Sequence, residues 1–166
     1  NTKVLWNAAR YFFLINEPAV AEELLIRGKE LEPKNPDWPD ALSHFYSLAR
    51  RKREREDAPA KALAELEAAI ALKGADVEGR EFGKAAQRAF AAAEFEKARS
   101  YANRAIEVAT GQDKNPALHY AHTVLGRLAM REGDRAKAVE HLLASGAVEQ
   151  YPTLSSFGPN MMLAKE

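Results

Sequence analysis

Four similar helical segments recur along this chain, and the opening residue of each is an alanine. The openings begin at Ala21, Ala62, Ala98 and Ala138, and read Ala-Glu-Glu-Leu-Leu, Ala-Leu-Ala-Glu-Leu, Ala-Arg-Ser-Tyr-Ala and Ala-Val-Glu-His-Leu. Upstream of each opening lies an apolar residue followed by a small one: Ala8-Ala9, Leu42-Ser43, Ala85-Ala86 and Leu125-Gly126. Such internal repetition is typical of stacked helical hairpins, because one hairpin cannot bury its apolar face alone.

Apolar residues recur at helical spacing after these openings, as in Ala62, Leu63, Leu66, Ala69 and Ile70. Residues three and four apart share one face of a helix, so each stripe predicts an amphipathic helix. Period-two alternation is absent from the sequence. Turn-forming residues separate the stripes, and the pattern predicts about eight helices joined in hairpins. The turns lie at 16–18, 33–36, 73–76, 111–116 and 133–134.

These repeats resemble those of tetratricopeptide repeat (TPR) proteins, whose unit is a helix–turn–helix of about 34 residues with a Trp-x2-Leu-Gly-x2-Tyr pattern and later Ala, Phe and Pro. In the first repeat, Leu5 stands at the Trp position, Phe12 at the Tyr position and Pro33 at the Pro position. The repeats cover about 2–35, 36–74, 79–109 and 117–145.

The resemblance implies an all-α fold in one domain over residues 1–166. We expect a right-handed α-solenoid of about four TPR-like hairpins, in which the stacked hairpins share one core. A capping loop and helix are expected at 150–166. The stretch from His119 through this tail, with its Ser-Phe-Gly-Pro-Asn segment, resembles the end of a little-characterised group of bacterial TPR-like proteins.

Composition excludes several classes of protein. Lysine and arginine together number 24, as do aspartate and glutamate, so the usual basic excess of a nucleic-acid binder is missing and we expect no nucleic-acid partner. The absence of cysteine excludes disulfides and thiolate metal sites. No apolar run approaches the roughly 20 residues that span a bilayer, so we expect no membrane partner and favour a cytoplasmic location. Since the chain lacks an initial Met and ends on what resembles a helix start, we expect the natural protein to continue.

The TPR resemblance also implies a concave face lined mostly by the first helix of each repeat. Arginine and lysine beside aromatic rings there suit a protein or peptide partner with acidic groups. Some TPR domains clamp a terminal carboxylate with five Lys, Asn and Arg residues; Trp6, Arg10 and Ala41 break that pattern here, so the clamp is not expected. The predicted binding residues are Trp6, Asn7, Arg10, Phe13, His44, Arg80, Lys84, Gln87, Tyr120 and Arg127.

Two alternatives stay open. A small-molecule-binding or catalytic helical domain would use His119 and His122, three residues apart on one predicted helix, and the Ser155–Asn160 loop. With His141 these histidines could ligate a metal, but no acidic residue stands at a zinc-protease spacing, so we expect no metal and no cofactor. A structural or self-associating module would fill the concave face with its own tail or with a second copy.

Motifs that would indicate an enzyme are absent. The sequence has no phosphate-binding glycine loop, no nucleophile elbow and no zinc protease motif, so we expect no catalytic activity. The dense charged run at 50–57 mixes both signs of charge. We interpret it as a solvated helix extension and loop, since nearby opposite charges stabilise such segments.

Overall fold

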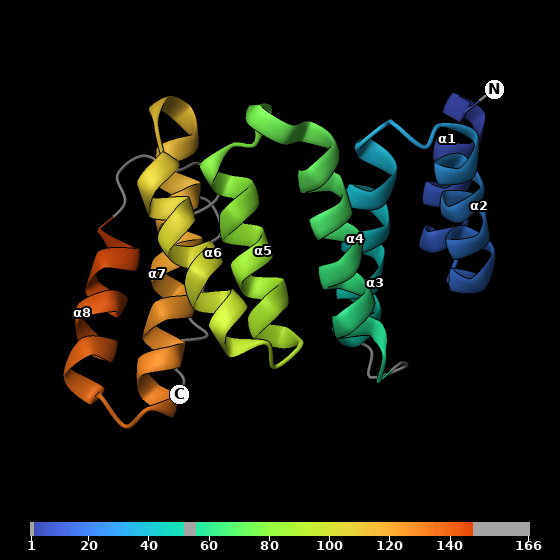
Figure 1. Cartoon of the computed structure of the whole chain (residues 1–166). Helices are drawn as coiled ribbons and strands as arrows, with labels where there is room; N and C mark the ends of the chain where they lie inside the picture. Colours follow the sequence, from blue (N-terminus) through green and yellow to red (C-terminus); the bar gives the residue numbers. More distant parts are fainter. Residues whose placement is uncertain (1, 52–55, 148–166) are drawn as a thin grey trace. The chain divides into compact units, whose positions relative to one another are not determined.

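A computed structural model describes residues 2–51 and 56–147, with the side chains of these ranges except those of residues 49–51. In these ranges the chain is built of α-helices and two short 3-10 turns, with no strand (Figure 1). The helices are α1 (Thr2–Leu14), α2 (Pro18–Leu31), α3 (Asp37–Arg51), α4 (Ala58–Lys73), α5 (Gly79–Ala91), α6 (Phe95–Val108), α7 (Lys114–Arg131) and α8 (Arg135–Gly146).

Consecutive helices pack as hairpins, α1 with α2, α3 with α4, α5 with α6 and α7 with α8. For the described residues this confirms the predicted all-α fold of four helical hairpins. The hairpins gather into two compact units, Asn1–Ala75 and Asp76–Glu166, which are described separately below. One continuous domain stays a prediction. The expected capping loop and helix at 150–166 lie outside the described residues, as does part of the charged run.

Turn chemistry sets where the helices begin and end. The chain leaves α1 through Asn16, whose φ of 65° is in the left-handed region that asparagine tolerates, and α2 then begins at Pro18. Gly74 ends α4 with a φ of 57°. Asp134 caps α8, since its carboxylate accepts a hydrogen bond of 3.0 Å from the backbone N–H of Lys137.

The core of the first unit forms where α3 packs on α1 and α2. Trp38 is 2% exposed, and its ring lies against Gly28 of α2. Ala21 and Ala62, two of the helix-opening alanines, are fully enclosed, so the helices of each hairpin approach closely at these positions. The sequence pattern therefore identified two buried positions of the core, although it did not identify Trp38.

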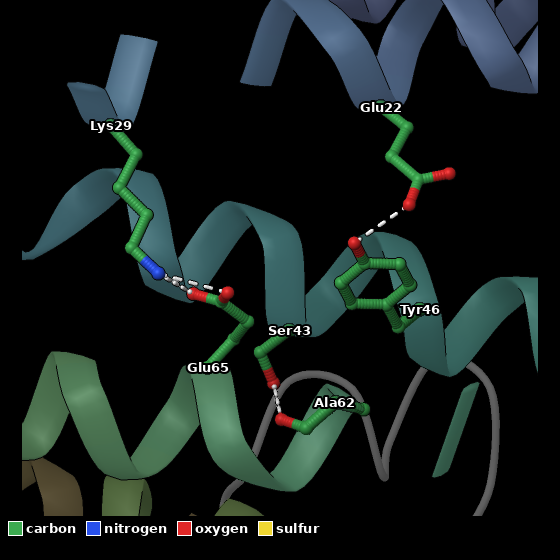
Figure 2. Close-up of polar contacts among 6 residues, drawn as sticks. All are labelled: Glu22, Lys29, Ser43, Tyr46, Ala62 and Glu65. Atoms are coloured by element: carbon green, nitrogen blue, oxygen red, sulfur yellow. Dashed lines mark hydrogen bonds and ion pairs between the residues drawn. The ribbon is translucent and has the colours of Figure 1, made fainter. Parts of the chain in front are cut away.

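Polar contacts also connect α2, α3 and α4 (Figure 2). The buried Ser43 hydroxyl donates a hydrogen bond of 2.7 Å to the Ala62 carbonyl oxygen. The Tyr46 hydroxyl donates one of 2.8 Å to Glu22 of α2. Lys29 Nζ on α2 lies 2.7 Å from Glu65 Oε2 on α4. Ser43 is the small residue of the second repeat, and Ala62 is its helix-opening alanine.

Alanine dominates the core of the second unit. The enclosed alanines lie on α5, α6 and α7 and include Ala85, Ala89, Ala98, Ala102, Ala105 and Ala121. Small side chains let these helices approach one another closely. Larger residues, among them Val124 and Leu128, fill the space around α7. Among the described helices none is long and apolar enough to cross a bilayer.

Candidate peptide-binding surface

One open pocket of the first unit collects four of the predicted binding residues. Trp6, Arg10 and Phe13 follow one another at intervals of four and three on α1, so they share a face. His44 of α3 faces the same space, which has a volume of about 380 Å³. We call it the α1–α3 pocket; it is lined by Trp6, Ala9, Arg10, Phe13, Leu14, Ala21, Leu25, Asp40, Ala41, His44, Phe45 and Leu48.

The pocket has apolar walls and charged or polar groups beside them. Leu25 and Phe45 belong to the buried core of the unit, whereas Arg10 and His44 are exposed and Asp40 is half-buried. Within the described ranges no hydrogen bond or ion pair engages the Arg10 guanidinium. Its donors are therefore available to an oxygen acceptor that enters from solvent.

Edge-to-face aromatic contacts hold the pocket walls in place. The Trp6 and Trp38 rings have centroids 5.2 Å apart at an interplanar angle of 67°. Phe13 and Phe45 have centroids 5.8 Å apart at 68°. Because each α1 ring packs on a buried α3 ring, the two half-buried walls are pre-organised rather than free to rotate.

Trp38 is a site residue that sequence reasoning missed. Its indole N–H donates a hydrogen bond of 2.8 Å to Glu32, and its ring packs edge-to-face against the Trp6 ring. The signal that could have found it is the repeat register, since Trp38 lies four residues before Leu42 at the start of a predicted helix. A tryptophan at that position is long enough to reach the preceding hairpin.

A second, more polar hollow shares Trp6 and Asp40 with the first. Its volume is about 480 Å³. Glu32 in this hollow accepts hydrogen bonds from Trp38, Asn35 and Thr2, which together hold the pKa of its carboxyl below the usual range. Its lining residues are Thr2, Lys3, Trp6, Glu32, Asn35, Asp37, Trp38 and Asp40. The predicted Asn7 is exposed on α1 and lines neither hollow.

The predicted cations of the second unit already have partners. The Arg80 backbone N–H donates to Asp113 Oδ2 at 2.8 Å, and its side-chain Nε lies 3.8 Å from Asp113 Oδ1. The Arg127 guanidinium carbon lies 4.1 Å from the centroid of the Phe90 ring, a cation–π contact. A ligand at either position would have to compete with these contacts.

The remaining predicted residues of this unit, Lys84, Gln87 and Tyr120, are half-buried. Tyr120 packs on Gly83, where an added β-carbon would lie 2.9 Å from the Tyr120 Cβ. Its ring also lies beside His119, with centroids 5.8 Å apart. Tyr120 thus takes part in helix packing within the unit. Binding at these positions stays a prediction.

The sequence suggested that His119 and His122 act together, but in the structure the two histidines have different partners. His119 is buried, and its Nδ1 lies 2.9 Å from the Ser145 carbonyl oxygen. His122 instead meets His141 of α8, with the two Nδ1 atoms 3.1 Å apart. His119 therefore belongs to the core. The Ser155–Asn160 loop lies outside the described residues.

Comparison with known proteins identifies the fold. No family model matches the chain, and no curated protein matches it. Two crystal structures of MamA are similar. One is 20% identical with a TM-score of 0.67, covering 87% of this chain and 76% of that chain. The other is 19% identical with a TM-score of 0.67, covering 96% of this chain and 78% of that chain. The likeness is one of fold alone, and with the paired helices it shows that the chain has a TPR-like helical-repeat fold.

Proposed function

We propose that this chain is a protein-interaction module that binds a peptide segment of a partner protein in the α1–α3 pocket. The observation that carries the proposal is the juxtaposition of pre-organised aromatic walls with the exposed Arg10 guanidinium. Ligand-binding sites commonly combine an apolar cavity with a few polar groups that fix orientation. TPR-like folds act mostly by presenting such surfaces to other proteins.

The chemistry of the pocket defines the segment that would fit. An aromatic or branched aliphatic side chain would be buried between Trp6 and Phe13, since large apolar anchors supply most of the energy at such interfaces. A carboxylate next to that anchor would reach Arg10 and form a charge-assisted hydrogen bond. In this proposal the preference for acidic peptides depends on one residue, Arg10 of the first unit, rather than on cations along the whole chain.

A peptide selection tests this proposal. Random linear peptides displayed on phage would be selected on the wild-type chain, and the enriched peptides assayed by calorimetry. We expect a motif with an aromatic or aliphatic residue next to Asp or Glu. Arg10→Glu should weaken binding of the selected peptides by about 2 kcal/mol or more, because it replaces a charge-assisted contact by repulsion.

The matched control is Lys34→Glu, which makes the same charge change at an exposed residue of the first unit that lines neither hollow. Binding by this variant should equal that of the wild type. If no motif is enriched, or if the two variants weaken binding equally, the α1–α3 pocket is not the peptide site.

A second candidate function, self-association, is favoured by exposed apolar residues on the outer side of α1. Val4, Tyr11 and Ile15 are 60%, 59% and 48% exposed. Their spacing of seven and four places them on one helix face, which we call the α1 outer stripe. An exposed apolar patch of this kind commonly marks an interaction surface.

The repeat register supports this candidate. Val4 and Tyr11 correspond to Trp38 and Phe45 of the second repeat, counted from Ala8 and Leu42. Trp38 and Phe45 are buried, 2% and 5% exposed, where α3 meets the preceding hairpin. The α1 outer stripe is therefore a stacking face of the same kind, and a helical hairpin of a second copy could cover it.

Sedimentation velocity over a range of concentrations tests self-association. The wild type should form a concentration-dependent dimer or larger species that Tyr11→Glu abolishes. Ile26→Glu is the matched control, since Ile26 is an exposed apolar residue of α2 outside the stripe. A wild type that stays monomeric at all concentrations would overturn the candidate.

A further inference from the structure

Two histidines face each other across the last hairpin. His122 of α7 and His141 of α8 have ring centroids 5.3 Å apart and planes inclined by 33°. Their Nδ1 atoms are 3.1 Å apart. Both side chains are half-buried. The pair lies in the second unit and takes no part in the α1–α3 pocket or in the function proposed for it.

We infer that His122 and His141 form a chelating site for a divalent transition-metal ion such as Zn²⁺. Imidazole nitrogen is a preferred ligand of Zn²⁺, Ni²⁺ and Cu²⁺. Two nitrogens that each lie about 2.0–2.1 Å from Zn²⁺ at a tetrahedral angle are about 3.3–3.4 Å apart. The observed separation of 3.1 Å is therefore close to that of two ligands of one ion, and small side-chain rotations would complete the fit.

The protonation state of the pair suits metal binding. Burial lowers the pKa of both imidazoles, and the proximity of His141 lowers the pKa of His122 further. Both rings are then neutral at neutral pH, which is the form that ligates metals. In the pair itself one Nδ1–H donates to the other Nδ1. When the ion binds both Nδ1 atoms, that proton moves to Nε2 of the same ring, so no net proton is released.

The charges around the pair do not oppose a cation strongly. Glu140 neighbours His141 and acts on both rings with a negative charge. Arg99 and Lys137 are the cations that act on His141. Each of them has its own carboxylate partner, Glu132 for Arg99 and Asp134 for Lys137, the latter at 3.2 Å. These ion pairs reduce the positive potential at the site.

The site has two protein ligands, so water would complete the coordination of the ion. In the described part of the chain no group of three or more histidine or acidic side chains is placed to hold a metal. Zinc sites with open positions exchange their water for other ligands, unlike closed structural sites. The inference revises the expectation from sequence that no metal binds.

Calorimetric titration of the full chain with zinc chloride tests the inference. The wild type should bind one Zn²⁺ saturably, and His122→Asn and His141→Asn should each abolish saturable binding. His44→Asn is the matched control, because His44 is exposed on α3 in the other unit and should leave Zn²⁺ binding unchanged. Loss of binding in the His44 variant, equal binding by all variants, or no saturation by the wild type up to millimolar Zn²⁺ would overturn the site.

A second measurement on the wild type keeps the test independent of how well the variants fold. Long-range ¹H–¹⁵N spectra report each imidazole nitrogen. Zn²⁺ should shift the Nδ1 resonances of His122 and His141 and convert the donor ring to the Nε2–H form, which the acceptor ring already has. The His119 resonances should not move, because its Nδ1 is engaged by the Ser145 carbonyl. A shift at His44 alone would place the ion elsewhere.

Discussion

The Trp38 ring lies so close to the α-carbon of Gly28 that a β-carbon on the glycine would be 2.4 Å from the ring atom Cζ3. The glycine lies in the last turn of α2, three residues before the helix ends at Leu31, and within a helix glycine is less favourable than alanine. Its role is to let α2 approach the indole that supports Trp6. The wall of the α1–α3 pocket therefore depends on a residue that does not line the pocket.

Gly28→Ala should destabilise the first unit because the added methyl group displaces the buried Trp38 ring. Overpacking of this kind costs about 1–3 kcal/mol, more than the gain in helix propensity from alanine. Urea denaturation followed by tryptophan fluorescence measures the loss. Gly146→Ala is the matched control, since outside its own helix backbone and chain neighbours no described residue lies within 4 Å of the added atom. Equal stability of the two variants would contradict the packing argument.

Ser43→Ala should lower stability by about 1 kcal/mol, because the hydroxyl that donates to the Ala62 carbonyl oxygen is buried. Ser47→Ala removes a hydroxyl from the same helix, but its hydrogen bond is exposed and local, to the His44 carbonyl oxygen. The Ser47 variant should therefore match the wild type. Chemical denaturation of both variants distinguishes a contact between helices from a general effect of serine in α3.

These contacts show which parts of the fold and of the pocket the repeat register predicts. The recurring alanines and small residues identify the hairpins and predict that Ser43 and Ala62 lie at a close helix contact. Register also places Trp6, Arg10 and Phe13 on one helix face, and they do line one pocket. This part of the fold follows from local periodicity, because residues three and four apart must lie on the same side of a helix.

Register could not indicate which cations have partners. Arg80 and Asp113 are far apart in sequence, and they meet because the turn before α7 returns to the start of α5. The Arg127–Phe90 contact likewise depends on how α7 packs on α5. Gly28 gives no sign of its role either, since a glycine in a helical segment is also compatible with a helix end. These features depend on tertiary packing.

Acidification should weaken the first unit through Glu32. Hydrogen bonds from Trp38, Asn35 and Thr2 lower its pKa in the folded state. A carboxyl with a lowered pKa stabilises the fold above its unfolded pKa of about 4.3, and that contribution is lost as the pH falls toward the folded pKa. Denaturant midpoints measured between about pH 6 and pH 3 should fall less steeply for Glu32→Gln than for the wild type.

The control for this pH series is Glu23→Gln, which removes an exposed carboxylate of α2. Its pH profile should parallel that of the wild type. Because the indole N–H of Trp38 donates to Glu32, the emission of the tryptophans should also change over the same pH range in the wild type. A profile of Glu32→Gln identical to that of the wild type would show that these hydrogen bonds do not depend on the charge.

The ion pair between Lys29 and Glu65 connects α2 to α4 and should couple the two hairpins of the first unit. The side chains are 39% and 20% exposed, so solvent screens the pair in part. A double-mutant cycle of Lys29→Met and Glu65→Gln should give a coupling of about 0.5–1 kcal/mol. The coupling should shrink in about 1 M salt, where the Debye length is near 3 Å.

The same cycle on Arg27 and Glu30, an exposed pair within α2, should give a smaller coupling. A larger coupling for that local pair would mean that Lys29 and Glu65 do not hold the hairpins together.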